Sequence, residues 1–182
     1  MGQSATLYRI NPKELPAIAE NPENFDLEAL TKGSETFEQT HEGLRFVLSK
    51  NQEEKVLPLV DQIFYPLFNT GDQVDFNNLD IDNLPEDFEL GLNFDGVAIY
   101  YNDTSVVSAI HAFLNTISDE MFLKLFNADE LNTNQVYPQV WSNDTVANHG
   151  FNQRTLLEDI AKLKRIYANA QAEGDYVLSF ID

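Results

Sequence analysis

The sequence predicts an α+β fold, a single compact domain with a mixed sheet and several amphipathic helices packed on it. Strand-like segments stand at both ends of the chain, and apolar residues recur at helical spacing between them. Helices and strands do not alternate in the strict rhythm of a doubly wound protein. The length of 182 residues suits one domain. We therefore expect residues 1–182 to form one unit.

The first part of the chain is expected to contain a strand followed by helices. Residues 5–10 alternate apolar and polar side chains, which is typical of a half-buried strand. Asn11 before Pro12 predicts a helix start, because the amide oxygen can accept from unpaired N–H groups. A connector or a single helical turn is expected over 24–30. Ser34 is expected to begin a helix whose apolar face comprises Phe37, His41, Leu44, Val47 and Leu48.

The middle of the chain is expected to hold core segments around a long loop. Residues 56–68 are apolar but interrupted by Pro58 and Pro66, which favours a strand or irregular core over a long helix. Residues 69–89 are rich in Asp and Asn and poor in large apolar side chains, so they predict a long acidic surface loop. Residues 97–101 predict a strand.

The last part predicts helices with clear ends and a final strand. Asp103 and Ser118 are capping residues, and each precedes a stretch with apolar side chains. From Leu156 to Ala170 apolar residues recur at helical spacing, and Gly174 stands where a left-handed residue ends a helix. Residues 176–181 then predict a strand.

The charge of the chain restricts its partners. Thirty acidic and eleven basic residues give a net charge of −19, and no Lys or Arg occurs between Lys55 and Lys124. Nucleic acids and anionic membrane surfaces are bound mainly through Lys and Arg. We therefore expect neither as a partner. The acidic surface either serves solubility or attracts a basic protein. The oligomeric state stays open.

Composition also bears on the compartment and on cofactors. The chain has no cysteine, which excludes disulfides, thiolate nucleophiles and cysteine metal sites. Its first residues lack the basic and apolar regions of a signal peptide, and no apolar run is long enough to span a bilayer. We expect a cytoplasmic protein. No cofactor motif is present, so no cofactor is expected.

Two short motifs partly match known metal-binding patterns, one for zinc and one for calcium. His41 and Glu42 form half of a zinc-protease signature, but Arg45 replaces the second His, and its positive charge would oppose a metal. A weak calcium candidate places side-chain oxygens at EF-hand spacing, and its main residues are Asn78, Asp80, Asp82 and Glu89. Asn83 replaces the usual Gly of such a loop, so an acidic surface loop is the default interpretation.

One further group of residues can line a pocket. Trp141 is the only Trp of the chain and follows Tyr137 and Pro138 closely. Aromatic residues of this kind are enriched in ligand grooves and at interfaces. If a pocket exists, we expect Arg45, Tyr137 and Trp141 around it. The alternative is that Trp141 packs its loop onto the last helix.

Three segments of the chain resemble the YfbM-like family of uncharacterised bacterial proteins. They are Leu7–Leu15, His41–Leu48 and, at the end, Val136–Trp141 with the helix and strand that follow. The resemblance implies a compact α+β domain in the cytoplasm. It assigns no reaction, so it carries no catalytic residue over to this chain.

The leading interpretation is an acidic, cytoplasmic, non-enzymatic protein-interaction domain that binds a basic partner. The charge imbalance favours it, together with the lack of a recognisable catalytic set of residues. The alternative is a small-molecule-binding protein or an enzyme that uses carboxylates near a Tyr137/Trp141 pocket. Catalysis is left open, with the sequence favouring a non-enzymatic role.

Overall fold

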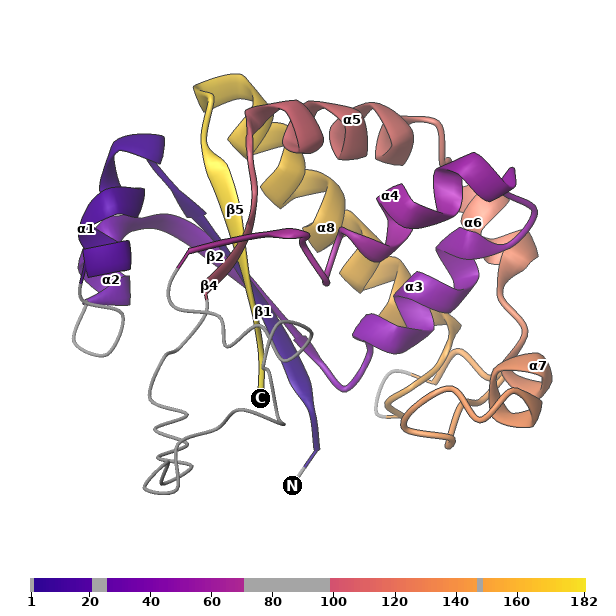
Figure 1. Ribbon diagram of the computed structural model, residues 1–182. Coiled ribbons are helices and arrows are strands. Elements are labelled where there is room, and N and C mark those ends of the chain that lie inside the picture. Colours follow the sequence, from indigo (N-terminus) through magenta and orange to yellow (C-terminus); the bar gives the residue numbers. More distant parts are fainter. Residues whose placement is uncertain (1, 21–25, 71–98, 147–148) are drawn as a thin grey trace, which may run out of the picture.

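The computed structural model describes residues 2–20, 26–70, 99–146 and 149–182 (Figure 1). Within them five strands form one sheet in the order β2-β1-β5-β4-β3. The strands are β1 (Ser4–Ile10), β2 (Thr31–Glu38), β3 (Phe68–Thr70), β4 (Ile99–Asn102) and β5 (Tyr176–Ile181). The α+β class is confirmed. The described sheet is antiparallel rather than mixed, because each neighbouring pair of strands runs in opposite directions.

Helices lie on both sides of this sheet (Figure 1). The smaller group comprises η1 (Pro12–Glu14), α1 (Leu15–Glu20) and α2 (Leu27–Leu30). The larger group comprises α3 (His41–Ser49), η2 (Glu54–Val56), α4 (Leu57–Asp61), α5 (Thr104–Asn115), α6 (Asp119–Leu125), α7 (Ala128–Thr133) and α8 (Gln153–Glu173). In the described part of the chain, none of these helices has the length and apolar character needed to cross a lipid bilayer.

Side-chain alternation along the strands produces a core on each face of the sheet. In β1, Leu7 belongs to the larger core, while Ile10 belongs to the smaller core beside α1 and α2. In β5, Val177 and Leu178 are divided between the two cores in the same way. All four side chains are fully buried, and each such burial stabilises the fold by roughly 1.5–3 kcal/mol.

Helix α8 is the central element of the larger core. Asn152 caps it by accepting a hydrogen bond from the Thr155 amide at 3.1 Å. Gly174 ends it in the left-handed conformation at φ 68°, as predicted from its position. The predicted apolar face is confirmed as buried, and it includes Leu156, Ile160, Leu163, Tyr167 and Ala170. The caps of α5 by Asp103 and of α6 by Ser118 are confirmed too.

A buried turn follows α4 and connects it to β3. Its backbone carbonyls are satisfied by three side chains from other elements: Asn102 donates to Gln62 at 2.7 Å, Tyr167 to Ile63 at 3.0 Å, and Ser179 to Phe64 at 2.6 Å. Burial raises the pKa of the Tyr167 phenol, which keeps it protonated as a donor. The strand or irregular core predicted for 56–68 is therefore a short helix and a turn, with a strand only from Phe68.

The helix predicted to start at Ser34 is wrong, because this segment is strand β2. It pairs antiparallel with β1 from Glu38 opposite Ser4 to Thr31 opposite Ile10. Phe37 is buried as a strand residue, and α3 begins only at His41. Between them Gln39 adopts φ 60°, which turns the chain. From His41 onward the predicted helix is present as α3, with Leu44, Val47 and Leu48 buried, so only its start was wrong: pairing with β1 makes the residues before it a strand.

The predicted acidic loop at 69–89 is described only at its first residues. Asn69 and Thr70 belong to β3, and residues 71–89 lie outside the described residues. The helical turn expected over 24–30 is present as α2, which Asp26 caps at the Ala29 amide. Helix α7 was not predicted, although Asn127 caps it at the Glu130 amide.

Candidate functional site

A pocket of about 610 Å³ lies between α3 and the segment that follows α7. Pockets that bind small molecules measure roughly 300–1,000 Å³, so its size suits a ligand or an inserted side chain. The lining is largely polar, and it comprises Gln3, Glu42, Arg45, Phe46, Ser49, Asn134, Gln135, Val136 and Tyr137. We refer to it as the α3 pocket.

Two of the three residues expected around a pocket, Arg45 and Tyr137, line the α3 pocket. Trp141 does not line it. Its side chain is buried in the larger core, and its indole N–H donates to the Val136 carbonyl at 2.9 Å. Trp141 thus supports the wall of the pocket from behind through Val136. A binding role for these residues stays a prediction.

Arg45 is held in one position by two carboxylates and an aromatic ring. Its Nε and Nη2 donate to one oxygen of Glu42 at 3.1 and 2.9 Å, and its Nη1 donates to Asp61 at 2.9 Å. The guanidinium lies 5.5 Å from the centre of the Tyr65 ring, a cation–π distance. The site around Arg45 therefore carries one more negative than positive charge.

The pKa values of Glu42 and Tyr65, the two titrating groups that contact each other beside Arg45, are shifted by burial and by their neighbours. Partial burial alone would raise the pKa of Glu42, but hydrogen bonds from Tyr65 and Arg45 outweigh it and hold that pKa below its ordinary value. Burial and the Glu42 carboxylate raise the pKa of the Tyr65 phenol. At neutral pH Glu42 is therefore an ionised acceptor and Tyr65 a protonated donor.

His41 lies directly behind this group and is fully buried. Its Nε2 is 3.9 Å from Glu42, and among the described residues neither ring nitrogen has a hydrogen-bond partner. Burial lowers its pKa, so the ring is neutral at pH 7. The sequence places His41 on the apolar face of a helix, and the structure buries it there in α3. The adjacent ring of Phe64, at 5.8 Å between centres, completes its apolar enclosure.

Tyr137 connects the pocket to the start of the sheet. Its hydroxyl accepts a hydrogen bond from the Gln3 amide at 3.0 Å, and the bond between Tyr137 and Pro138 is cis. Glu42 and Arg45 are three positions apart on α3, a spacing at which helical side chains meet, so their pairing was accessible to sequence reasoning. Asp61 and Tyr65 come from another element, and no local pattern indicates them.

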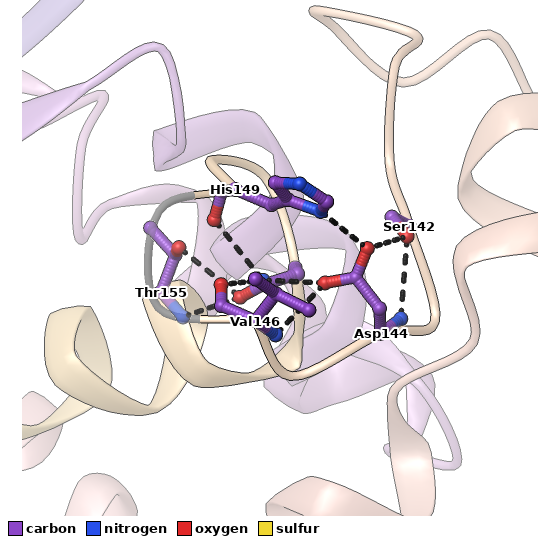
Figure 2. Close-up of polar contacts among 6 residues, drawn as sticks. Ser142, Asp144, Val146, His149 and Thr155 are labelled. Carbon is purple, nitrogen blue, oxygen red and sulfur yellow. Dashed lines mark hydrogen bonds and ion pairs between the residues drawn. The ribbon is translucent and has the colours of Figure 1, made fainter.

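A second polar cluster, shown in Figure 2, contains Ser, Asp and His but not the geometry of a nucleophile and its base. Ser142 donates to Oδ2 of Asp144 at 2.7 Å, and His149 Nδ1 lies 2.9 Å from the same oxygen. The hydroxyl therefore bonds the carboxylate, whereas nucleophilic catalysis needs it on the imidazole. Hydrogen bonds from His149 and Ser142 lower the pKa of Asp144.

Asn152, the residue that caps α8, connects this cluster to the loop before the helix. Its amide donates to Asp144, to the Val146 carbonyl and to the His149 carbonyl, at 3.0 to 3.1 Å. Its oxygen accepts from the amide of Thr155. The buried side chain is thus bonded on both sides, and the cluster stabilises the loop.

No metal centre is formed by the residues that the structure describes: none of their His, Asp and Glu side chains gather in threes as metal ligands. The calcium candidate Asn78, Asp80, Asp82 and Glu89 lies outside the described residues and is not tested. At the half zinc-protease signature of His41 and Glu42, the position where the signature needs a second His holds Arg45, whose guanidinium forms ion pairs with Glu42 and Asp61.

Comparison with known proteins places the chain among uncharacterised relatives. A family model described as Domain of unknown function (DUF1877) matches residues 1–180. The structure is similar to a protein of unknown function, YfbM from Escherichia coli, with a TM-score of 0.60 and 15% sequence identity. The similarity covers 98% of this chain and 99% of that one, and it shows the shared fold alone. No match was found among curated proteins. The predicted resemblance to YfbM-like proteins is confirmed.

Proposed function

Because this chain belongs to the family described as Domain of unknown function (DUF1877), we propose its function from its own surface: a non-enzymatic domain that binds a basic protein at the α3 pocket. The observation that carries the proposal is this pocket, which has mostly polar lining residues and whose one cation, Arg45, is paired with Glu42 in the lining and with Asp61 beside it. We also propose that the protein is cytoplasmic, because a chain without cysteine needs no oxidising compartment to form disulfides.

The distribution of carboxylates supports a docking surface. In the described part of the chain only Asp159 and Asp175 are buried acids, and each is paired with a lysine, Lys162 or Lys32. The other described acids are wholly or partly exposed. With a net charge of −19, these outward carboxylates attract cationic partners and accelerate their encounter.

The α3 pocket supplies the position at which such a partner is held. Arg45 is neutralised by Glu42 and Asp61, so it does not repel a basic side chain. The amide groups of Asn134 and Gln135 offer oxygen acceptors at the rim, where a lysine or arginine of the partner can bond. Long-range attraction brings the partner to the surface, and the pocket determines where it binds.

A titration with defined peptides tests the proposal. We expect a fluorescent Lys- and Arg-containing peptide to bind with an affinity that falls as salt increases, and a neutral peptide of equal length to bind far more weakly. Asn134→Tyr should fill the pocket and weaken binding about tenfold, a change of roughly 1.4 kcal/mol. The matched variant Asn115→Tyr, on the exposed surface of α5, should bind like the unmodified protein.

The outcomes separate the two parts of the proposal. If no basic peptide binds in a salt-sensitive way, the basic partner is refuted. If Asn134→Tyr and Asn115→Tyr bind the peptide equally, the charge attracts partners but the α3 pocket is not where they are held.

A small polar molecule is the second candidate occupant, and the size of the α3 pocket favours it. Such a ligand would raise the melting temperature in a metabolite screen, because it binds the folded state alone. Asn134→Tyr should abolish this rise and Asn115→Tyr should preserve it. A screen without any pocket-dependent rise would remove this candidate.

A further inference from the structure

His41 lies behind the wall of the α3 pocket and is separated from it by a single residue. The ring is fully buried, and among the described residues neither of its nitrogens has a hydrogen-bond partner. His41 does not line the pocket itself, but Glu42 and Arg45 of the same helix do. Buried polar side chains are normally hydrogen-bonded, so the two free nitrogens of His41 are an exception in this fold. A titratable group is thus placed directly beside the pocket wall.

Glu42 connects His41 to the groups that hold Arg45. Its Oε1 lies 3.9 Å from Nε2 of His41 and accepts a hydrogen bond from the Tyr65 hydroxyl. Its Oε2 accepts both hydrogen bonds from Arg45, at 3.1 and 2.9 Å. Because one carboxylate serves all three neighbours, a movement of Glu42 toward His41 changes the wall of the α3 pocket.

The surroundings of His41 contain one more carboxylate than cation. The charged and titratable side chains around it are Glu42 and Arg45 on α3, Asp61 on α4, Tyr65 in the turn after α4, and Asp159 and Lys162 on α8. Helix α6 also packs on α3, but its charged side chains are exposed and pair with one another or with α8. Burial outweighs the nearby Glu42 carboxylate, so the pKa of His41 is lowered and the ring is neutral at pH 7.

We infer that His41 is a pH switch for the α3 pocket, which holds its basic partner while the ring is neutral and releases it when the ring takes up a proton. The inference rests on the function proposed above and adds its regulation. The protonated ring has two N–H donors, and Oε1 of Glu42 comes within reach after a shift of about 1 Å. This attraction draws Glu42 away from Tyr65. The excess negative charge of the group around Arg45 is then cancelled, so a cationic partner is attracted less.

The coupling between the proton and the partner is reciprocal. Because a proton on His41 weakens the binding of a cationic partner, a bound cationic partner weakens the binding of the proton by the same factor. Partner binding is fully present above pH 6.5 and is lost as the pH falls toward the lowered pKa of His41. Exposed carboxylates have pKa values of about 4, so the surface charge that attracts the partner persists over this range.

Peptide titrations at a series of pH values test the switch. A fluorescent Lys- and Arg-containing peptide is titrated at constant ionic strength from about pH 7.5 to about pH 5, and circular dichroism establishes that the protein is folded at each pH. We expect the affinity to fall by about fivefold or more, as is typical of coupled sites. His41→Leu should keep the same affinity at every pH. The matched variant His111→Gln, on α5, should behave like the unmodified protein.

An NMR titration of the His41 ring measures the same coupling without any variant. In the full chain labelled at histidine, saturating peptide should lower the proton affinity of His41 by the factor found in the peptide titrations. A chain that binds no peptide at pH 7.5 refutes the proposed function and its regulation together. Equal binding at both ends of the pH range, a pH dependence that persists in His41→Leu, or a His41 proton affinity that the peptide leaves unchanged overturns the switch alone.

Discussion

At the scale of single residues, His41 and Asn152 are both buried but differ in their hydrogen bonding. Asn152 donates to three acceptors and caps α8, so its burial is compensated. His41 has no partner for either nitrogen among the described residues, so it tolerates burial only as the neutral ring. One side chain therefore stabilises the fold through its contacts, and the other makes stability depend on pH.

Stability should fall in mild acid because of His41. Burial lowers its folded-state pKa, so as the pH falls the unfolded chain binds this proton first. The stability that depends on neutral His41 is fully present above pH 6.5, the ordinary pKa of the residue. It is lost as the pH falls from there toward the folded-state pKa, by about 1.4 kcal/mol for each unit by which that pKa is lowered. Urea unfolding between pH 7.5 and pH 5, chosen to span roughly this window, measures the loss. His41→Leu should remove it and His111→Gln on α5 should retain it; equal pH dependence in all three proteins would contradict this role.

Asn152→Ala should destabilise the protein by about 2–3 kcal/mol. It removes the α8 cap and leaves two backbone carbonyls and an Asp144 oxygen without this donor. Chemical unfolding measures the difference. The matched change Asn115→Ala, at an exposed site, should cost less than about 0.5 kcal/mol. A cost for Asn152→Ala as small as that for Asn115→Ala would show that the loop is not held by this residue.

At the scale of elements, α3 and the Trp141 segment are fitted closely together. A Cβ placed on Gly43 would lie 2.3 Å from the Trp141 ring, so only glycine lets the helix approach it. Trp141 in turn is fixed by the side chain of Asn132, whose Nδ2 donates to the Trp141 carbonyl at 2.9 Å and whose Oδ1 accepts from the Trp141 amide at 3.0 Å. This contact places Val136 and Tyr137 opposite Arg45, and so it forms the α3 pocket.

Gly43→Ala should destabilise the chain by about 1–3 kcal/mol, although alanine is the better helix former by roughly 1 kcal/mol. The added methyl group must displace the Trp141 ring. Gly150→Ala is the control, since nothing lies within 4 Å of its added Cβ, and it should be neutral or slightly stabilising. Thermal unfolding compares them. A stabilising Gly43→Ala would mean that α3 and Trp141 are not in close contact.

An element could be predicted from the sequence when the residues that determine it, such as its caps and its apolar face, lie within the element itself. Helix α8 and its ends were predictable, because Gly174 and the apolar spacing belong to the helix itself. Strand β2 was not, since its structure depends on pairing with β1, and its one large apolar residue, Phe37, also falls in register with the apolar face of α3. Within the site, the sequence indicated Arg45 and Tyr137, but their meeting depends on packing through Trp141, and Asp61 arrives from a separate element.

At the scale of the whole molecule, the chain keeps most of its described carboxylates outward and pairs the two that it buries, Asp159 and Asp175. An arrangement of this kind attracts cations over the surface instead of concentrating charge at a reacting centre. The surface charge alone attracts cations without fixing where they bind, and in the proposed function the α3 pocket is the place where a partner binds specifically. The function proposed for the domain is therefore recognition.

Hydrogen exchange with and without a saturating basic peptide tests this account most directly. We predict slower exchange in α3 and at residues 134–137 when the peptide is bound, and loss of this protection when salt is raised from about 0.05 to 0.5 M, because the Debye length then shortens severalfold. Peptide-induced protection located elsewhere, for example on α1 and α2, or protection that salt does not weaken, would contradict it.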